Sequence, residues 1–323
     1  MKKIVSILLS LLLVLSLAAC MKVKAGESSG KSDTAAVTAQ PTAEPTAAPT
    51  PEPTEVPFEA VLIAANEKLA QVKSLHMDMD LTMEMELTIA MGELRQSMPM
   101  NVHMIYAVDS IQDPYVAKMD LSLSSMGEEM QGLIYAVRDG ENTVLYTSDD
   151  DGVTWRKNTN PEEAASTLPQ SPEETFSLFN GIETDIQKTG TQELNGKLAT
   201  VYSGKVSGKF LQQILSTTGA AGELTEAMGV EMTEETLANL SDILVTVLID
   251  EESGLPVRYT IDMTDAMHDI MEAAMLASMG GELPESVEVI LDMPVTMLDM
   301  ILSNFNSVEP IEIPEAALNA PEL

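Results

Sequence analysis

The chain has 323 residues, a formal net charge of −34 at pH 7 and a hydrophobic fraction of 45%. Such an acidic surface repels the phosphates of nucleic acids and the headgroups of anionic lipids, which argues against nucleic-acid binding and against direct adhesion to a negatively charged bilayer. The length and the apolar content are sufficient to bury a sizeable core.

The N-terminus carries the signals for export and lipid attachment. Lys2 and Lys3 precede a short apolar run, and together they predict a secretory signal peptide over residues 1–19. The run ends in Leu-Ala-Ala-Cys, the pattern of a bacterial lipobox, so Cys20 is predicted to carry acyl chains that anchor the mature protein in a membrane. The alternative is an ordinary signal peptide followed by an incidental cysteine. Cys20 is the only cysteine, which leaves none for a disulfide within the chain, a zinc site or a catalytic thiol.

Residues 20–57 are predicted to be a disordered linker that begins at the lipidated cysteine. They are rich in Pro and Thr and have no apolar periodicity, so they cannot bury enough surface to fold. Their prolines favour an extended polyproline II conformation of about 3.1 Å per residue, which would hold the next domain away from the membrane. The predicted location is therefore the extracytoplasmic face of the cell membrane.

From Phe58 onward the sequence predicts one α+β domain, residues 58–323. Apolar residues at three- and four-residue spacing predict an amphipathic helix over residues 58–73. Runs of alternating apolar and polar residues then predict an antiparallel meander with one apolar face. Its strands are expected at residues 75–89, 98–108, 115–123, 130–138 and 142–147.

The rest of the domain is predicted to return to the sheet after a helical crossover. Residues 161–180 indicate short helices and loop, and residues 220–240 are acidic. A strong hairpin is expected over residues 242–263, with its turn at Glu251–Gly254. The remaining expected elements are a strand at 198–208, helices at 209–219 and 264–279, and a last strand at 286–306.

The first predicted strand has an unusual apolar face. From Leu75 to Ile89, every odd position is Leu, Met or Ile, and every even position is His, Asp, Thr or Glu. Methionine is unbranched and flexible, so a surface rich in it can repack around apolar ligands of different shapes. The 23 methionines of the chain therefore indicate either a ligand-accommodating wall or a filled core. Under the first interpretation, the predicted wall residues are Met77, Met79, Leu81, Met83, Met85, Met104 and Met119.

Residues 148–155, Ser-Asp-Asp-Asp-Gly-Val-Thr-Trp, match the S-x-D-x-G-x-T-W Asp-box of sialidase-like propellers. A propeller needs such a unit in several blades, whereas this chain has one copy and one tryptophan. Asp and Gly favour a turn, Ser and Thr hydrogen-bond its backbone, and Trp covers the hairpin. We therefore predict a hairpin turn between strands at 142–147 and 153–157, rather than a carbohydrate enzyme or a lectin.

The three histidines are weak candidates for a metal site. His76, His103 and His268 are far apart in the sequence, and the first two fall on the polar faces of their predicted strands. They are predicted to be surface residues rather than ligands.

Acidic side chains are also arranged in pairs on the first strand, as Asp78 with Asp80 and Glu84 with Glu86. A calcium site needs oxygen ligands wrapped by a tight loop, so a solvated face is the preferred interpretation. No nucleophile elbow, phosphate-binding loop or metal-binding helix motif is present, and the sequence predicts no enzyme activity, metal or cofactor.

Three segments resemble the LolA-like group of lipoproteins and carriers, which includes LppX- and LprG-type mycobacterial lipoproteins and uncharacterised lipoproteins of Gram-positive bacteria. They are ANEKLAQVKSLHMDMDLTMEM at the start, LIDEESGLPVRYTIDM in the hairpin and NFNSVEPIEIPEAA at the end. The resemblance implies a half-open β-barrel wrapped around helices, with an apolar cavity between them, and members of known role carry lipids or lipoproteins. This chain departs from the group in its acidity, length and methionine content.

The sequence thus predicts a membrane-anchored lipoprotein that binds or carries a lipid or another apolar molecule in a cavity lined by Met and Leu. The alternative is a structural or sensory envelope protein whose core is filled. Met21 is not the aspartate that retains many Gram-negative lipoproteins in the inner membrane. Because the resemblances include Gram-positive lipoproteins, we favour a Gram-positive host.

Overall fold

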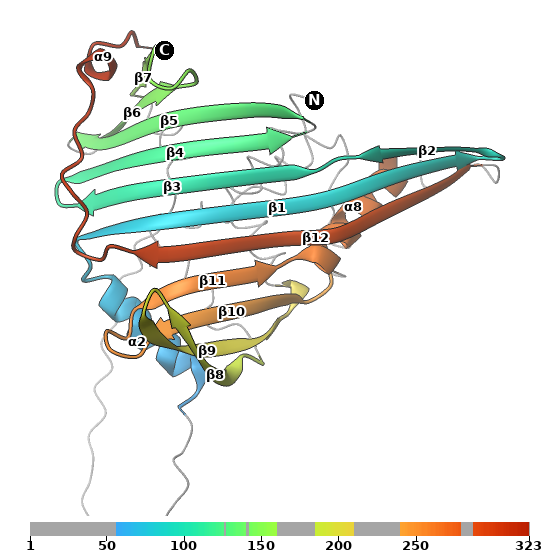
Figure 1. The fold of residues 1–323 in the computed structure, drawn as a ribbon, viewed down its shortest axis with the longest axis horizontal. Coiled ribbons are helices and arrows are strands. Elements are labelled where there is room, and N and C mark those ends of the chain that lie inside the picture. Colours follow the sequence, from blue (N-terminus) through green and yellow to red (C-terminus); the bar gives the residue numbers. More distant parts are fainter. Residues whose placement is uncertain are drawn as a thin grey trace, which may run out of the picture.

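The computed structural model describes residues 56–125, 127–139, 142–159, 185–209, 240–278 and 287–322. These residues form one antiparallel sheet of 12 strands in the order β7-β6-β5-β4-β3-β1-β12-β11-β10-β9-β8, with β2 beside the outer half of β1 (Figure 1). The order starts at β7 and ends at β8, so the sheet is not closed. The predicted α+β fold, a large antiparallel sheet in a half-open barrel with a few helices, is confirmed.

The strands of the first half form an antiparallel meander, as predicted, except that β2 pairs with β1 and not with β3. They are β1 (Ser74–Met91), β2 (Leu94–Pro99), β3 (Val102–Gln112), β4 (Tyr115–Ser125), β5 (Glu128–Asp139), β6 (Asn142–Ser148) and β7 (Arg156–Asn158). The later strands are β8 (Gln187–Leu194), β9 (Lys197–Val206), β10 (Ile243–Asp250), β11 (Pro256–Asp262) and β12 (Val287–Ser303). The helices of the described residues are α2 (Phe58–Leu69), α8 (Thr264–Ser278) and α9 (Glu315–Leu318).

Helix α2 ends four residues earlier than predicted, because the chain turns after Leu69 to enter β1. The amide of Val72 donates to the carbonyl of Leu69 at 2.9 Å, which closes the turn. The helix is tied to the β10–β11 hairpin, since Lys68 Nζ donates to the carbonyl of Ser253 at 2.7 Å. Its buried residues follow the predicted helical spacing and are Phe58, Leu62, Ala65 and Leu69.

The predicted hairpin over residues 242–263 is confirmed and has a well-bonded turn. Asp250 accepts hydrogen bonds from the amide and the hydroxyl of Ser253, both at 2.6 Å. Gly254 has φ of 69°, a left-handed conformation that glycine adopts without steric cost. Asp262 then accepts hydrogen bonds from the amide and the hydroxyl of Thr264, the first residue of α8.

One predicted strand is broken in the structure. Residues 98–108 were expected to be continuous, but β2 ends at Pro99 and β3 begins at Val102. Proline has no amide hydrogen to donate to a ladder, and the amide of Met100 turns to the carbonyl of Met85 at 2.7 Å. The outer half of β1 therefore pairs with β2, and its inner half with β3.

A small second hydrophobic cluster lies at β5 and β6, on the face of the sheet opposite the main hydrophobic core. Its buried members are Tyr135, Val144, Tyr146, Trp155 and Ala317, and we call it the Trp155 cluster. The C-terminal tail runs along the ends of the strands to reach it (Figure 1). The tail then continues beside β7, where the amide of Lys157 donates to the carbonyl of Pro321 at 3.0 Å.

Several predicted segments lie outside the described residues. They are the signal peptide, Cys20, most of the linker, residues 161–180, and nearly all of the expected helix 209–219 and the acidic segment 220–240. Within the described part of the chain, no helix has the length and apolar character required to cross a membrane.

Candidate functional site

The candidate site is one face of the sheet, which we call the inner face and define by Met77, Met79, Leu81, Met83 and Met85 of β1. These side chains point to one side because successive residues of a strand alternate between the two faces. All five belong to the main hydrophobic core. The opposite, outer face carries the even positions of the same strand.

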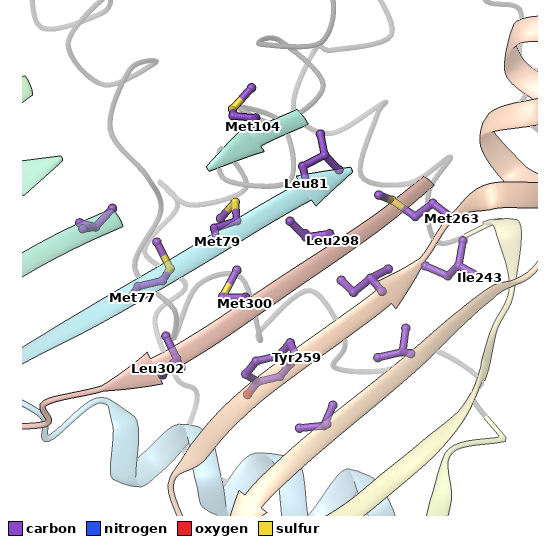
Figure 2. Close-up of a cluster of buried hydrophobic side chains, with 14 of the residues drawn as sticks. Met77, Met79, Leu81, Met104, Ile243, Tyr259, Met263, Leu298, Met300 and Leu302 are labelled. Atoms are coloured by element: carbon purple, nitrogen blue, oxygen red, sulfur yellow. The ribbon is translucent and has the colours of Figure 1, made fainter. Parts of the chain in front are cut away.

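The structure brings all seven predicted wall residues into this core. None of the seven is more than 8% exposed, and Met119 is completely buried. Figure 2 shows Met77, Met79, Leu81 and Met104 projecting to the same side of the sheet as Leu298, Met300 and Leu302 of β12. The alternation in β1 was thus sufficient to predict which face is buried.

Register places the inner-face residues in rows that run across the sheet. One row passes through Tyr106 of β3, Met79 of β1, Met300 of β12 and Tyr259 of β11. A neighbouring row is Met104, Leu81, Leu298 and Ile261 in the same four strands. Residues directly opposite each other in an antiparallel pair have Cβ atoms about 4.5–5.5 Å apart, so each row is a continuous apolar band.

Two helices pack against the inner face. Helix α2 contributes its buried stripe near β9, where the rings of Phe58 and Tyr202 are 5.4 Å apart. Helix α8 packs on β12 and places Met267 and Ile270 in the same core. The face is therefore an internal surface, as the half-open barrel requires.

Few polar atoms interrupt this apolar layer. The hydroxyl of Tyr106 donates to Sδ of Met119 at 3.3 Å, and burial raises the pKa of Tyr106 well above its usual value. Thr296 of β12 lies opposite Met83 and is fully buried. Within the described part of the chain its Oγ1 has no hydrogen-bond partner, which is costly for a hydroxyl in an apolar environment.

The outer face is polar and carries two of the histidines. His76 Nδ1 lies 2.8 Å from Asp109 Oδ1, and its Nε2 lies 3.1 Å from Asp78 Oδ1. Burial opposes the charged imidazolium, but the hydrogen bonds and negative charges of Asp109 and Asp78 outweigh it and raise the pKa of His76. His103 pairs with Asp80 at 3.1 Å.

The third histidine lies elsewhere, since Nε2 of His268 on α8 is 3.3 Å from the carbonyl of Leu291. Among the described residues, no group of three or more His, Cys, Asp or Glu side chains is arranged to hold a metal ion. Arg258 and Asp299 form a bidentate pair on the outer face, with N–O distances of 2.7 and 3.0 Å.

The structure contains a pocket that the sequence did not indicate. It has a volume of about 560 Å³ and lies where β2 separates from β3. Its lining is mainly polar and consists of Thr82, Met83, Glu84, Pro99, Asn101, Val102, His103, Ser124 and Gly127. It shares Met83 with the predicted wall, but most of its other lining residues are polar and none is another wall residue, so it is not the Met- and Leu-lined cavity expected from the sequence.

The Asp-box segment forms a hairpin turn between β6 and β7, as predicted. Asp150 accepts from the amide of Thr154 at 2.8 Å and from its hydroxyl at 2.5 Å. The amide of Gly152 donates to Ser148 Oγ at 2.9 Å, and Trp155 Nε1 donates to the carbonyl of Gly152 at 2.9 Å. The hydrogen bonds that Asp150 accepts from the hydroxyl and amide of Thr154 and from the hydroxyl of Ser148 lower its pKa to about 2, with the Thr154 hydroxyl as the largest contributor. Residues 148–155 therefore stabilise a hairpin turn.

Comparison with protein families places the chain in a family described as "Family of unknown function (DUF6612)", whose model matches residues 58–322. The chain therefore belongs to that family. The comparison with curated proteins gives no match.

Among solved structures, the chain is similar to LprF from Mycobacterium bovis, with 11% identity and a TM-score of 0.41 over 80% of this chain and 96% of LprF. It is also similar to the lipoprotein LppX from Mycobacterium tuberculosis, with 16% identity and a TM-score of 0.37 over 80% of this chain and 98% of LppX. The predicted resemblance to LppX-type lipoproteins is thus confirmed.

Proposed function

We propose that the protein is a lipid-anchored, extracytoplasmic lipoprotein that binds a lipid or another apolar molecule non-covalently on the inner face. The observation that carries this proposal is the continuous layer of Met and Leu side chains across β1, β3 and β12. Anchoring through Cys20 supplies the membrane location. The protein acts as a carrier or a receptor for the ligand and not as an enzyme.

The choice of side chains supports binding over simple core filling. Strand positions usually favour β-branched and aromatic residues, whereas four of the five β1 residues that define the inner face are methionines, at positions 77, 79, 83 and 85. A methionine layer specifies its own packing weakly and can rearrange when a ligand enters. Burial of an alkyl chain against it would contribute about 0.8 kcal/mol per methylene.

Thr296 supplies a point of polarity within this layer. Its hydroxyl, which finds no partner among the residues that the structure describes, lies beside Met83, in an environment where a lone polar group is unfavourable. A ligand with one polar group and an alkyl chain would satisfy this hydroxyl and bury its chain along the rows. We infer that an amphipathic lipid fits the face better than a pure hydrocarbon.

The second candidate is a structural or sensory envelope protein whose inner face is only a core. The low exposure of the seven wall residues favours it, because side chains that already contact one another need no ligand. The two functions differ in one observable property. A binding protein takes up lipid in a fixed ratio, and a filled core does not.

The test uses the mature chain, residues 20–323, with Cys20→Ser to remove the acyl anchor. Native mass spectrometry followed by solvent extraction should detect a stoichiometric lipid on the wild-type sequence. Met79→Asp with Met83→Asp should abolish uptake or folding, because both substitutions put a charge into the apolar layer. Ile105→Asp is the matched control, since Ile105 is exposed on the outer face of β3. A lipid-free mass that added lipids do not change would support the filled core.

A further inference from the structure

The outer half of β1 forms a projection that the proposed function does not use. Residues 86–91 of β1 pair with β2 on one side and with residues 287–292 of β12 on the other. Figure 1 shows this three-stranded end, which we call the tip, extending beyond the neighbouring strands. The β1–β2 turn at Gly92, with φ of 63°, lies at its end.

The tip has one apolar and one polar face. Directly paired residues share a face, so Leu87 lies with Met98 and Leu291, and Met91 lies with Leu94. The apolar face consists of Leu87, Ile89, Met91, Leu94, Met98, Val289 and Leu291, with Gln96 as its one polar member. The other face carries Glu86, Thr88, Arg95, Ser97, Glu288 and Asp292, together with Ala90 and Ile290.

The exposed fraction of the odd-numbered side chains of β1 increases from Leu75 toward the tip. They are buried from Leu75 to Met85, and Leu87 and Ile89 are half-buried. Met91 is 54% exposed, and Leu94 across the turn is 73% exposed. The apolar face of the tip is therefore a direct extension of the inner face into solvent. Contiguous exposed apolar surface of this kind marks an interaction site.

The N-terminal part of the chain identifies the occupant. The predicted anchor at Cys20 is separated from Phe58 by a linker whose polyproline II form would reach on the order of 100 Å. A domain tethered in this way stays within reach of a bilayer. The apolar face of the tip carries no charged side chain, so it suits insertion into a zwitterionic interface, even though the acidic domain is repelled by anionic lipid.

We propose that the apolar face of the tip is a bilayer-contacting surface. The choice of a bilayer rests on the lipid anchor of the proposed function. With Met91 and Leu94 in the lipid interface, β1 forms an unbroken apolar path from the bilayer to the inner face. An amphipathic lipid could then move along the strand without crossing water.

The experiment measures partition of the unlipidated mature chain, residues 20–323 with Cys20→Ser, onto phosphatidylcholine vesicles by flotation. Met91→Asp with Leu94→Asp should lower partition by about tenfold or more, because two exposed apolar anchors become charged. Ile290→Asp is the matched control, since Ile290 is exposed on the opposite face of the same tip. It should leave partition unchanged. Fluorescence of Trp155, far from the tip, verifies that each variant is folded.

Two results would overturn the proposal. The first is a partition that is equal for wild type and the Met91→Asp/Leu94→Asp variant. The second is a dimer that the double substitution converts to a monomer in sedimentation, with no vesicle binding, which would identify a second copy as the occupant. Uptake of a dissolved short-chain lipid is measured in parallel. If the tip binds vesicles but no variant takes up lipid, the tip assignment stands and the lipid-binding function fails.

Discussion

The two hydrophobic clusters of the described residues differ in composition and packing. The main core is a broad layer of Met, Leu, Ile and Val side chains on the inner face. The Trp155 cluster is small and aromatic, with Tyr135 and Trp155 rings 5.7 Å apart, and it is bordered by the hydrogen-bonded Asp-box turn. The first can repack at low cost, whereas the second has one favourable arrangement.

The Trp155 cluster therefore has one defined packing arrangement, whereas the side chains of the inner face can pack in several ways. In the Trp155 cluster, the indole nitrogen and the turn carboxylate all have hydrogen-bond partners, and the C-terminal tail closes over them. On the inner face, by contrast, the buried hydroxyl of Thr296 has no hydrogen-bond partner among the described residues. We expect substitutions between apolar side chains to destabilise the Trp155 cluster strongly and the inner face only mildly.

The largest expected effect is that of Trp155→Ala. The substitution removes a buried indole together with its hydrogen bond to the carbonyl of Gly152, and large-to-small aromatic replacements of this kind cost about 3–5 kcal/mol. The free energy of unfolding in urea measures it. Val153→Ala in the same turn is the control, because Val153 is exposed and its replacement should change stability by less than about 0.5 kcal/mol. Equal effects of the two substitutions would show that the cluster is not specifically packed.

An intermediate effect on the free energy of unfolding is expected when the Asp-box turn is brought to low pH. Asp150 has a pKa lowered to about 2, against an ordinary value of 3.8, because its charged form accepts bonds from Thr154 and Ser148. The stabilisation is present above pH 3.8 and is lost as the pH falls toward 2. Trp155 is the only tryptophan, so its fluorescence reports on this region.

The matched variant is Asp150→Asn, which keeps the shape of the side chain but has no charge to lose. The stability difference between wild type and Asp150→Asn should shrink as the pH falls from 5 to 2. A difference that is constant over this range would mean that the charge of Asp150 does not contribute.

The local patterns of the sequence predicted much of this fold. The alternation of β1 and the hairpin over residues 242–263 were recognisable because each contains its own period and turn. The break after Pro99 was missed, since Met98, Met100 and Val102 maintain the alternation across it. Strand β8 was missed because Gln187–Leu194 at the edge of the sheet has no apolar face.

The candidate site was predicted only in part, because long-range pairing determines the rest. Burial of the odd positions of β1 follows from alternation. Their neighbours Met300 and Leu298 depend on β12, which pairs with β1 from more than 200 residues later in the chain. The packing of the C-terminal tail on Trp155 is also a long-range contact, and neither segment has a sequence pattern that predicts its contact with the other.

The smallest expected change in stability is that of Met79→Leu with Met300→Leu. These residues face each other in one row of the inner face, and volume-conserving apolar replacements usually cost less than about 1.5 kcal/mol. Leucine is branched and stiffer than methionine, so the variant should bind a narrower range of alkyl chain shapes, as measured by competition among lipids of different chain length and unsaturation. Met297→Leu on the outer face should alter neither property. If the double variant instead loses as much stability as Trp155→Ala, the inner face is as specifically packed as the Trp155 cluster, and methionine there fills a core rather than adapting to a ligand.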